Sequence, residues 1–283
     1  MTRSTESLRA FMASSQRTVR PPAFPWAIAV GAGKGGVGTS SVAALLAVEE
    51  ARAGERVLLV DAVDGVGSQH LIFGRPDPGA TLDALQGGGA QAEDLVVHVD
   101  PNLHLFPSGG VPEAEMSAAE GRALRRRVTR LFERYSVVIL DVGSGMSSAR
   151  TASRYGVGRL LCVTTPERIA LAASYAVFKV VRSGGTAIAV TLLVNGATES
   201  DARGVHATVR AATKNFLGTE VGYAGAIPSD ELLSGCIEAG TPLPDLDPSA
   251  PSAEAASGIV RRLRADVRAP VPSDSETAPI SLR

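Results

Sequence analysis

The sequence predicts an α/β fold with a doubly wound, mostly parallel sheet and helices on both of its faces. Short apolar runs alternate with longer helical patterns between residues 24 and 265. The runs are almost continuously apolar, which is typical of parallel strands that are covered on both faces. The first run leads into a glycine-rich loop and then a helix, an order that is typical of nucleotide-binding members of this fold class.

The predicted elements follow in order along the chain. Runs such as "RVLLVD" and "SVVILD" are short and rich in branched apolar residues, so we expect strands at 26–32, 56–61, 103–109, 136–141, 159–165, 186–195 and 221–228. The segments between them are expected to form helices at 39–53, 113–134, 146–156, 167–182, 199–217, 229–239 and 252–266. The domain then spans residues 25–266, between a flexible N-terminal arm (1–24) and a disordered C-terminal tail (267–283).

Two of the predicted helices carry arginines on one side. In the helix at 113–134, arginines at 122, 126, 130 and 134 lie opposite a stripe of leucine and valine. This side is either a solvated face or a nonspecific DNA surface, and the net charge of −1 argues against nucleic acid. The segment 257–268 is also amphipathic, and it either docks on its own domain or binds a membrane surface.

Bulk composition excludes several classes of protein. With 45% hydrophobic and 20% charged residues, the 283-residue chain has an ordinary globular composition. No apolar run approaches the ~18 residues that a membrane span needs. Cys162 and Cys236 match no metal or redox spacing, as expected for a reduced cytoplasmic protein. A peripheral position at the inner face of the membrane is the alternative location.

The stretch "GAGKGGVGTSS", residues 31–41, resembles a phosphate-binding loop. The usual pattern is Gly, four residues, Gly, Lys and then Ser or Thr. Gly33, Gly38 and Ser40 fit this pattern, but Thr39 stands where the lysine is usual and Lys34 stands just inside the first glycine. Glycines let successive backbone N–H groups turn inward toward an anion, and the following helix adds its N-terminal dipole. The alternative is a glycine-rich turn without a ligand.

Two aspartates end neighbouring apolar runs and are candidates for a Mg²⁺ site. Asp61 closes "RVLLVD" and Asp141 closes "SVVILD". Ligands bind beyond the carboxyl ends of parallel strands in such folds, so both positions agree with a site beside the loop. Ser40 is placed where the loop hydroxyl would hold Mg²⁺. The alternative for Asp141 is a strand-end residue that caps a turn.

The loop "GKGGVGTSS" resembles the deviant Walker A loop of the MinD/ParA family. Lys34 falls on the family's signature lysine, which the resemblance implies reaches across an ATP-sandwiched homodimer. "RVLLVDA" is similar to the switch I strand, "VVILDVGSG" to the Walker B segment, and "LLVN" to a strand that ends in a base-contacting asparagine, here Asn195. "NLHLFPSGG" and "FLGTEVGYAGAIPSDELLSGCIEAGTPL" resemble more specifically the FlhG/FleN branch, which implies flagellar or polar protein partners.

The resemblance implies ATP and Mg²⁺ as cofactors and assigns roles to particular residues. The residues implied to bind nucleotide are Gly33, Lys34, Gly35, Gly36, Val37, Gly38, Thr39, Ser40, Asn195 and Pro228. Those implied to act in catalysis are Lys34, Asp61, Asp64 and Asp141, and those implied to hold the metal are Ser40, Asp61 and Asp141. Whether Lys34 acts on its own subunit or on the partner's nucleotide is open.

Two catalytic elements depart from the family pattern. Thr39 replaces the charged loop lysine, and the second aspartate of the family's Asp-x-Asp switch falls on Val63, with Asp64 one residue later. We therefore expect a nucleotide-binding regulator of flagellar number, flagellar placement or polar organisation, with weak or absent hydrolysis. The alternatives are an active ParA-like ATPase that partitions DNA or cargo, and a scaffold that binds no nucleotide.

Overall fold

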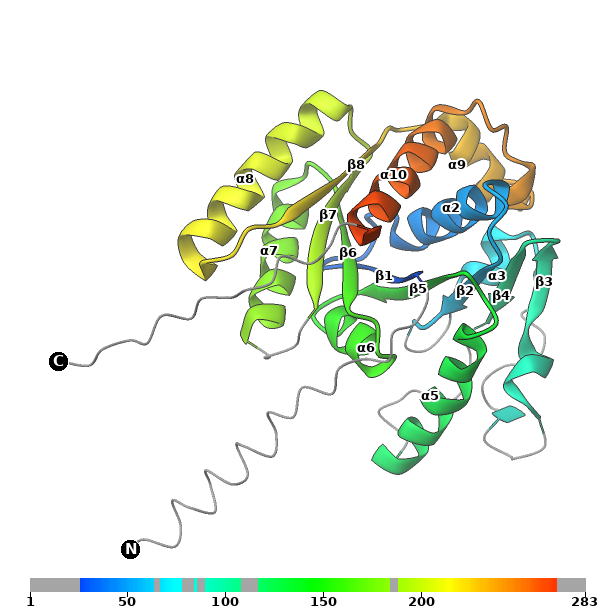
Figure 1. Cartoon of the computed structure of the whole chain (residues 1–283). Helices are drawn as coiled ribbons and strands as arrows, with labels where there is room; N and C mark the ends of the chain where they lie inside the picture. The colour runs from blue at the N-terminus through cyan, green and yellow to red at the C-terminus, as the bar shows by residue number, and fades with distance from the viewer. Residues whose placement is uncertain are drawn as a thin grey trace, which may run out of the picture.

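The computed structural model describes residues 26–63, 67–77, 84–85, 90–107, 117–183 and 188–268, and its centre is one eight-stranded sheet (Figure 1). The strand order is β3-β4-β2-β5-β1-β6-β7-β8. The strands are β1 (Trp26–Ala32), β2 (Val57–Asp61), β3 (Val97–Asp100), β4 (Leu103–Phe106), β5 (Val137–Ser144), β6 (Arg159–Thr164), β7 (Ala189–Asn195) and β8 (Gly222–Ile227). All neighbouring pairs are parallel except β3 with β4. The predicted fold class is therefore confirmed.

Successive residues of the central strands point into two separate cores, one on each face of the sheet. In β1, for example, Ile28 and Val30 belong to one core and Ala29 to the other, as the two-residue period of a strand requires. The first core is covered by α2 (Thr39–Arg52), α3 (Gln69–Ile72), α9 (Glu231–Glu238), the short 3₁₀ turn Leu243–Asp245 and α10 (Pro251–Arg268). The second is covered by the 3₁₀ turn Ala92–Leu95, α5 (Ala118–Phe132), α6 (Ser148–Arg154), α7 (Arg168–Ser183) and α8 (Glu199–Leu217).

The predicted strands and helices are present, with shifted ends in several places. The helix expected at 113–134 begins at Ala118, where Ser117 and Glu120 form a reciprocal capping box. β5 continues beyond Asp141 to Ser144. The sequence did not predict β3, α3 or the two 3₁₀ turns. The first two residues of the predicted tail at 267–283 belong to the last turn of α10; the rest of that tail and the arm at 1–24 lie outside the described residues.

Helix α10 docks on its own domain. Ile259, Val260 and Leu263 are buried in the core that α10 shares with α2 and β8. Arg264 forms ion pairs with Glu50 of α2 and with Glu55. The large apolar residues that are described in segment 257–268 are thus already covered, which favours the docked alternative over a membrane-binding face. Across the described part of the chain, no helix combines the length and the apolar character that a membrane span requires.

Helix α5 presents its arginines to solvent. Arg122, Arg126 and Arg130 are exposed, whereas Leu124 and Val128 on the opposite stripe are buried in the second core. The apolar stripe therefore explains why the helix lies on the sheet, as the amphipathic pattern predicts.

Candidate functional site

The loop at 31–41 connects β1 to α2 in the geometry of an anion-binding loop. Gly36 and Gly38 have φ angles of +78° and +83°, in the left-handed region that glycine adopts without strain. Gly38 is the residue that precedes α2; no side chain caps the helix, and its first turn contains no acidic residue. The first N–H groups of α2, together with the loop amides, are therefore available to an anion.

Gly33 and Gly38 allow the loop to approach neighbouring elements closely. A Cβ atom at Gly33 would lie 2.2 Å from the carbonyl oxygen of Ala173 in α7. A Cβ atom at Gly38 would lie 2.4 Å from Nδ2 of Asn195 at the end of β7. Asn195 Nδ2 donates a hydrogen bond of 3.0 Å to the carbonyl oxygen of Val37. Asn195 thus holds the loop in place, and its contact with a base stays a prediction.

Lys34 is partly exposed at the rim of the loop. Its Nζ lies 3.6 Å from Oε2 of Glu167, and the two side chains are 39% and 67% exposed. An ion pair this exposed contributes at most about 1 kcal/mol, so Lys34 can leave it at little cost. Thr39, in contrast, is buried at the start of α2, and its hydroxyl brings no charge to the place of the usual loop lysine.

The two candidate metal-binding aspartates lie side by side. Asp61, the last residue of β2, and Asp141, three residues before the end of β5, are register partners, and both are buried. Asp141 Oδ1 accepts a hydrogen bond of 3.0 Å from the N–H of Gly143. A Cβ atom at Gly143 would be 3.4 Å from the methyl groups of Val63, so an apolar side chain lies against the last residues of β5. Asp64 lies outside the described residues.

Gln69 belongs to this cluster, and sequence reasoning missed it. Its N–H donates to Asp61 Oδ2 at 3.1 Å, and its Nε2 donates to Asp141 Oδ2 at 2.8 Å and to the carbonyl oxygen of Ser40 at 3.0 Å. The side chain is fully buried. No local pattern marks a single glutamine between a switch segment and the apolar triplet "LIF", so only the folded chain brings it to the site.

Pro228 lies at the same edge of the sheet. It follows Ile227, the register partner of Asn195 in the last parallel pair. The next helix, α9, begins at Asp230, whose carboxylate accepts hydrogen bonds from the N–H of Leu232 and from Ser252 in α10. These bonds hold the pKa of Asp230 below its usual value, although burial acts in the opposite direction. Asp230 therefore fixes this corner and is not free for a ligand.

The backbone N–H groups of the loop and the side-chain oxygens beside it fit a polyphosphate with Mg²⁺. The uncapped helix start and the left-handed glycines offer backbone N–H groups to phosphate oxygens. Mg²⁺ prefers oxygen ligands and keeps several waters, and Ser40 with the carboxylates of Asp61 and Asp141 offers such oxygens. Within the described ranges, no cluster of three or more His, Cys, Asp or Glu side chains suits a metal held by protein alone.

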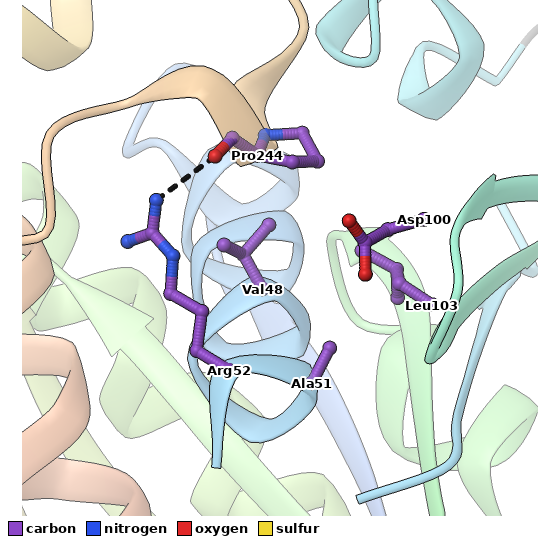
Figure 2. Close-up of a pocket in the computed structure, with 6 residues that line it drawn as sticks. All are labelled: Val48, Ala51, Arg52, Asp100, Leu103 and Pro244. Atoms are coloured by element: carbon purple, nitrogen blue, oxygen red, sulfur yellow. Dashed lines mark hydrogen bonds between the residues drawn. The ribbon is translucent and has the colours of Figure 1, made fainter. Parts of the chain in front are cut away.

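A second hollow lies at the other end of α2 and is separate from this site. Figure 2 shows Val48, Ala51 and Arg52 of α2 facing Asp100, Leu103 and Pro244 across an open pocket of about 120 Å³. Arg52 Nη2 donates to the carbonyl oxygen of Pro244 at 3.0 Å and joins α2 to the segment before α10. The pocket lies beside the last turn of α2, whereas the loop lies before its first turn.

Similar proteins share the domain along most of its length. An uncharacterised ATP-binding protein of Methanocaldococcus jannaschii is 26% identical over 84% of this chain and 87% of its own. The flagellum site-determining protein YlxH of Helicobacter pylori is 27% identical over 73% of this chain and 70% of its own. Each match extends over 210 residues or more, so neither rests on a single motif.

A solved structure has the same fold. The septum site-determining protein MinD from Pyrococcus horikoshii, complexed with Mg-ADP, aligns with a TM-score of 0.66 and 22% identity over 87% of this chain and 100% of that one. The family model described as cellulose biosynthesis protein BcsQ matches residues 27–261. The chain therefore belongs to the BcsQ family, within the MinD/ParA group that the loop and strand motifs resemble.

Proposed function

We propose that this protein binds ATP with Mg²⁺ at the loop between β1 and α2 and acts as a nucleotide-dependent regulator. One observation carries the proposal: the uncapped start of α2 and two left-handed glycines lie next to the paired aspartates Asp61 and Asp141. The relatives support it, because one is described as ATP-binding and the MinD structure contains Mg-ADP.

Each group has a distinct part in this proposal. Backbone N–H groups from Gly35 to Ser40 donate hydrogen bonds to phosphate oxygens, and Lys34 adds a positive charge at the rim of the loop. Mg²⁺, when bound, neutralises charge on the phosphates, with Ser40 as a direct ligand. Asp61 and Asp141 are placed to orient metal-bound water. Asn195 keeps the loop closed through its bond to Val37.

Hydrolysis is weak in this proposal because two groups are replaced. A preorganised donor that is lost from an active site typically costs about 10²–10³ in rate, and Thr39 cannot supply the charge of the usual lysine. The methyl groups of Val63 lie against Gly143 and cannot orient water. ATP binding is affected less than hydrolysis, since the loss of one charge-assisted hydrogen bond costs roughly 1.5–3 kcal/mol of binding free energy.

The edge that carries the loop also has the surface character of an interface. Of the exposed large apolar side chains among the described residues, four follow the carboxyl ends of strands, on the side of the sheet where the loop lies: Leu71, Met146, Ile169 and Leu232, after β2, β5, β6 and β8. The fifth, Phe216, is at the end of α8, on the opposite side. Apolar side chains gathered at one functional edge are typical of a surface that binds protein. We therefore assign this edge to an ATP-dependent homodimer, with the partly exposed Lys34 placed to reach the partner's phosphates.

The regulated process is the placement of a surface structure. The relative YlxH is described as flagellum site-determining, which favours flagellar or polar protein partners. The family description favours a second process, cellulose biosynthesis. Deletion of the gene followed by counts of flagella and by cellulose staining distinguishes the two, because each process predicts a change in one readout only.

ATP titration by calorimetry, with parallel measurement of molecular mass, tests the biochemical core of the proposal. We expect saturable Mg²⁺-dependent binding, a rise in mass toward the dimer and little phosphate release. Thr39→Lys should tighten binding about ten- to a hundred-fold. Rapid phosphate release by the native protein would indicate an active ATPase instead, and no binding by either protein would indicate a nucleotide-free scaffold.

A further inference from the structure

Gln69 touches three parts of the candidate site at once. Through its N–H and its side-chain amide it contacts the end of β2 at Asp61, β5 at Asp141 and the first turn of α2 at Ser40. Its side chain is 0% exposed. These contacts make Gln69 a bridge between the two aspartates and the first turn of α2.

The other half of the same amide group is unsatisfied. Oε1 of Gln69 is buried and finds no hydrogen-bond donor among the described residues. Rotating the amide by 180° would not help, because it would place the oxygen against the Ser40 carbonyl and the Asp141 carboxylate, which both accept hydrogen bonds. A buried acceptor without a donor is costly and calls for a physical explanation.

We infer that the Gln69 carbonyl oxygen is an acceptor for the hydrated Mg²⁺ that accompanies the nucleotide. Oε1 shares its amide carbon with the nitrogen that bonds Asp141, so it lies beside the carboxylates that would hold metal-bound waters. Water on a cation is a strong hydrogen-bond donor, and Mg²⁺ keeps several of its waters in protein sites. This inference rests on the proposed function, since it assigns a residue to the same site.

The assignment makes Gln69 a sensor as well as a binding residue. The residue begins α3, in the segment that follows Asp61, and its amide contacts the helix that starts at the phosphate loop. A ligand that satisfies Oε1 would therefore stabilise the link between β2, β5 and α2 together. The chain would then report Mg-nucleotide, rather than nucleotide alone, to the edge that carries Leu71.

Two substitutions separate this role from a purely structural one. Gln69→Leu removes both the donor and the acceptor at similar volume. Gln69→Glu keeps an acceptor but replaces the donor with a second carboxylate beside Asp141. If Gln69 only braces the site through its donor, Gln69→Glu is at least as damaging as Gln69→Leu. If Oε1 serves the hydrated cation, Gln69→Glu keeps the effect of Mg²⁺ and Gln69→Leu loses it.

The experiment measures the dissociation constant of ATP with EDTA and with excess Mg²⁺ at pH 8 in the full chain. We expect Gln69→Leu to reduce the Mg²⁺-dependent gain in affinity roughly ten-fold or more, and to weaken the affinity in EDTA by a smaller factor, because the variant also loses the donor that braces Ser40. Gln69→Glu should keep the gain. Thr213→Val is the control, because Thr213 is buried in α8, away from the site, and its hydroxyl donates to the Arg210 carbonyl of the same helix.

The possible outcomes distinguish the two proposals. A native protein that binds ATP, with a Gln69→Leu variant whose Mg²⁺-dependent gain is unchanged, overturns the role of Gln69 and leaves the proposed function standing. Equal losses in EDTA and in Mg²⁺ also overturn it, as a structural role predicts. A native protein that binds no nucleotide overturns both. If Gln69→Leu does not fold, Gln69→Glu alone tests the inference: it is refuted if Mg²⁺ no longer increases the affinity of that variant for ATP.

Discussion

Three alanine substitutions in the phosphate loop should have three different effects, because the glycines differ in their surroundings. In Gly33→Ala, the new Cβ would meet the Ala173 carbonyl at 2.2 Å, and backbone cannot rotate away, so we expect a loss of about 1–3 kcal/mol or more. Gly36→Ala has open space but a φ of +78°, which costs roughly 1–2 kcal/mol. In Gly35→Ala the nearest atom is Ser144 Oγ at 3.5 Å, an ordinary contact, so stability should change by no more than about 0.5 kcal/mol.

Urea unfolding checks these magnitudes. Trp26 is the only tryptophan of the chain and begins β1, so its fluorescence reports the strand that precedes the loop. Calorimetric ATP titration of the same variants measures a second property, their affinity for the nucleotide. Gly35 is exposed, and a methyl group there should hinder phosphate approach and weaken ATP binding without weakening the fold. The reasoning is refuted if Gly33→Ala unfolds at the native midpoint, or if Gly35→Ala is as unstable as Gly33→Ala.

Four further substitutions test the site and the core. Lys34→Ala should abolish ATP binding or dimerisation, whereas Glu167→Ala should not weaken binding, because the exposed ion pair holds Lys34 only loosely. Calorimetry with mass measurement checks both variants, and equal losses of binding in the two would contradict the role of Lys34. Arg264→Ala should destabilise the fold by about 3–5 kcal/mol, since it leaves the 0% exposed Glu50 without its charged partner, and an unchanged urea midpoint would contradict this. Burial lowers the pKa of His104 below 6.5, with the neighbouring charges adding to the effect. As the pH falls, His104 is therefore protonated more readily in the unfolded chain than in the folded one, so the free energy of unfolding decreases as the pH drops below 6.5. In His104→Asn, urea unfolding should show a smaller decrease in this free energy between pH 7.5 and 5.5.

The sequence predicted the central sheet well because each buried strand is an almost unbroken apolar run. β3 was not predicted, because it is a half-exposed edge strand, "VHVD", without such a run. The start of α5 could have been placed correctly from Ser117 and Glu120, since a serine followed three residues later by glutamate is a known helix start. Edge strands and short turns depend on neighbours distant in sequence, which local patterns do not contain.

The candidate site was predicted in part. The loop, Asp61 and Asp141 follow from spacing and from their position at strand ends, and the structure brings them together. The bracing role of Asn195 and the bridging role of Gln69 could not be foreseen, because each depends on a contact across the fold. Family membership confirms the resemblance drawn from the loop, while the roles of the individual site residues stay predictions.

The docking of α10 on α2 limits how attachment to a bilayer can be studied in this protein. A deletion that removes the last helix would strip Ile259, Val260 and Leu263 from the core and leave Glu50 without Arg264. A shortened protein would therefore lose its fold together with any lipid affinity, and a negative vesicle experiment with it would say nothing about anchoring. Substitution of the exposed Arg261, whose guanidinium donates a hydrogen bond to the Ser257 hydroxyl one turn earlier, probes the same surface while the helix stays in place.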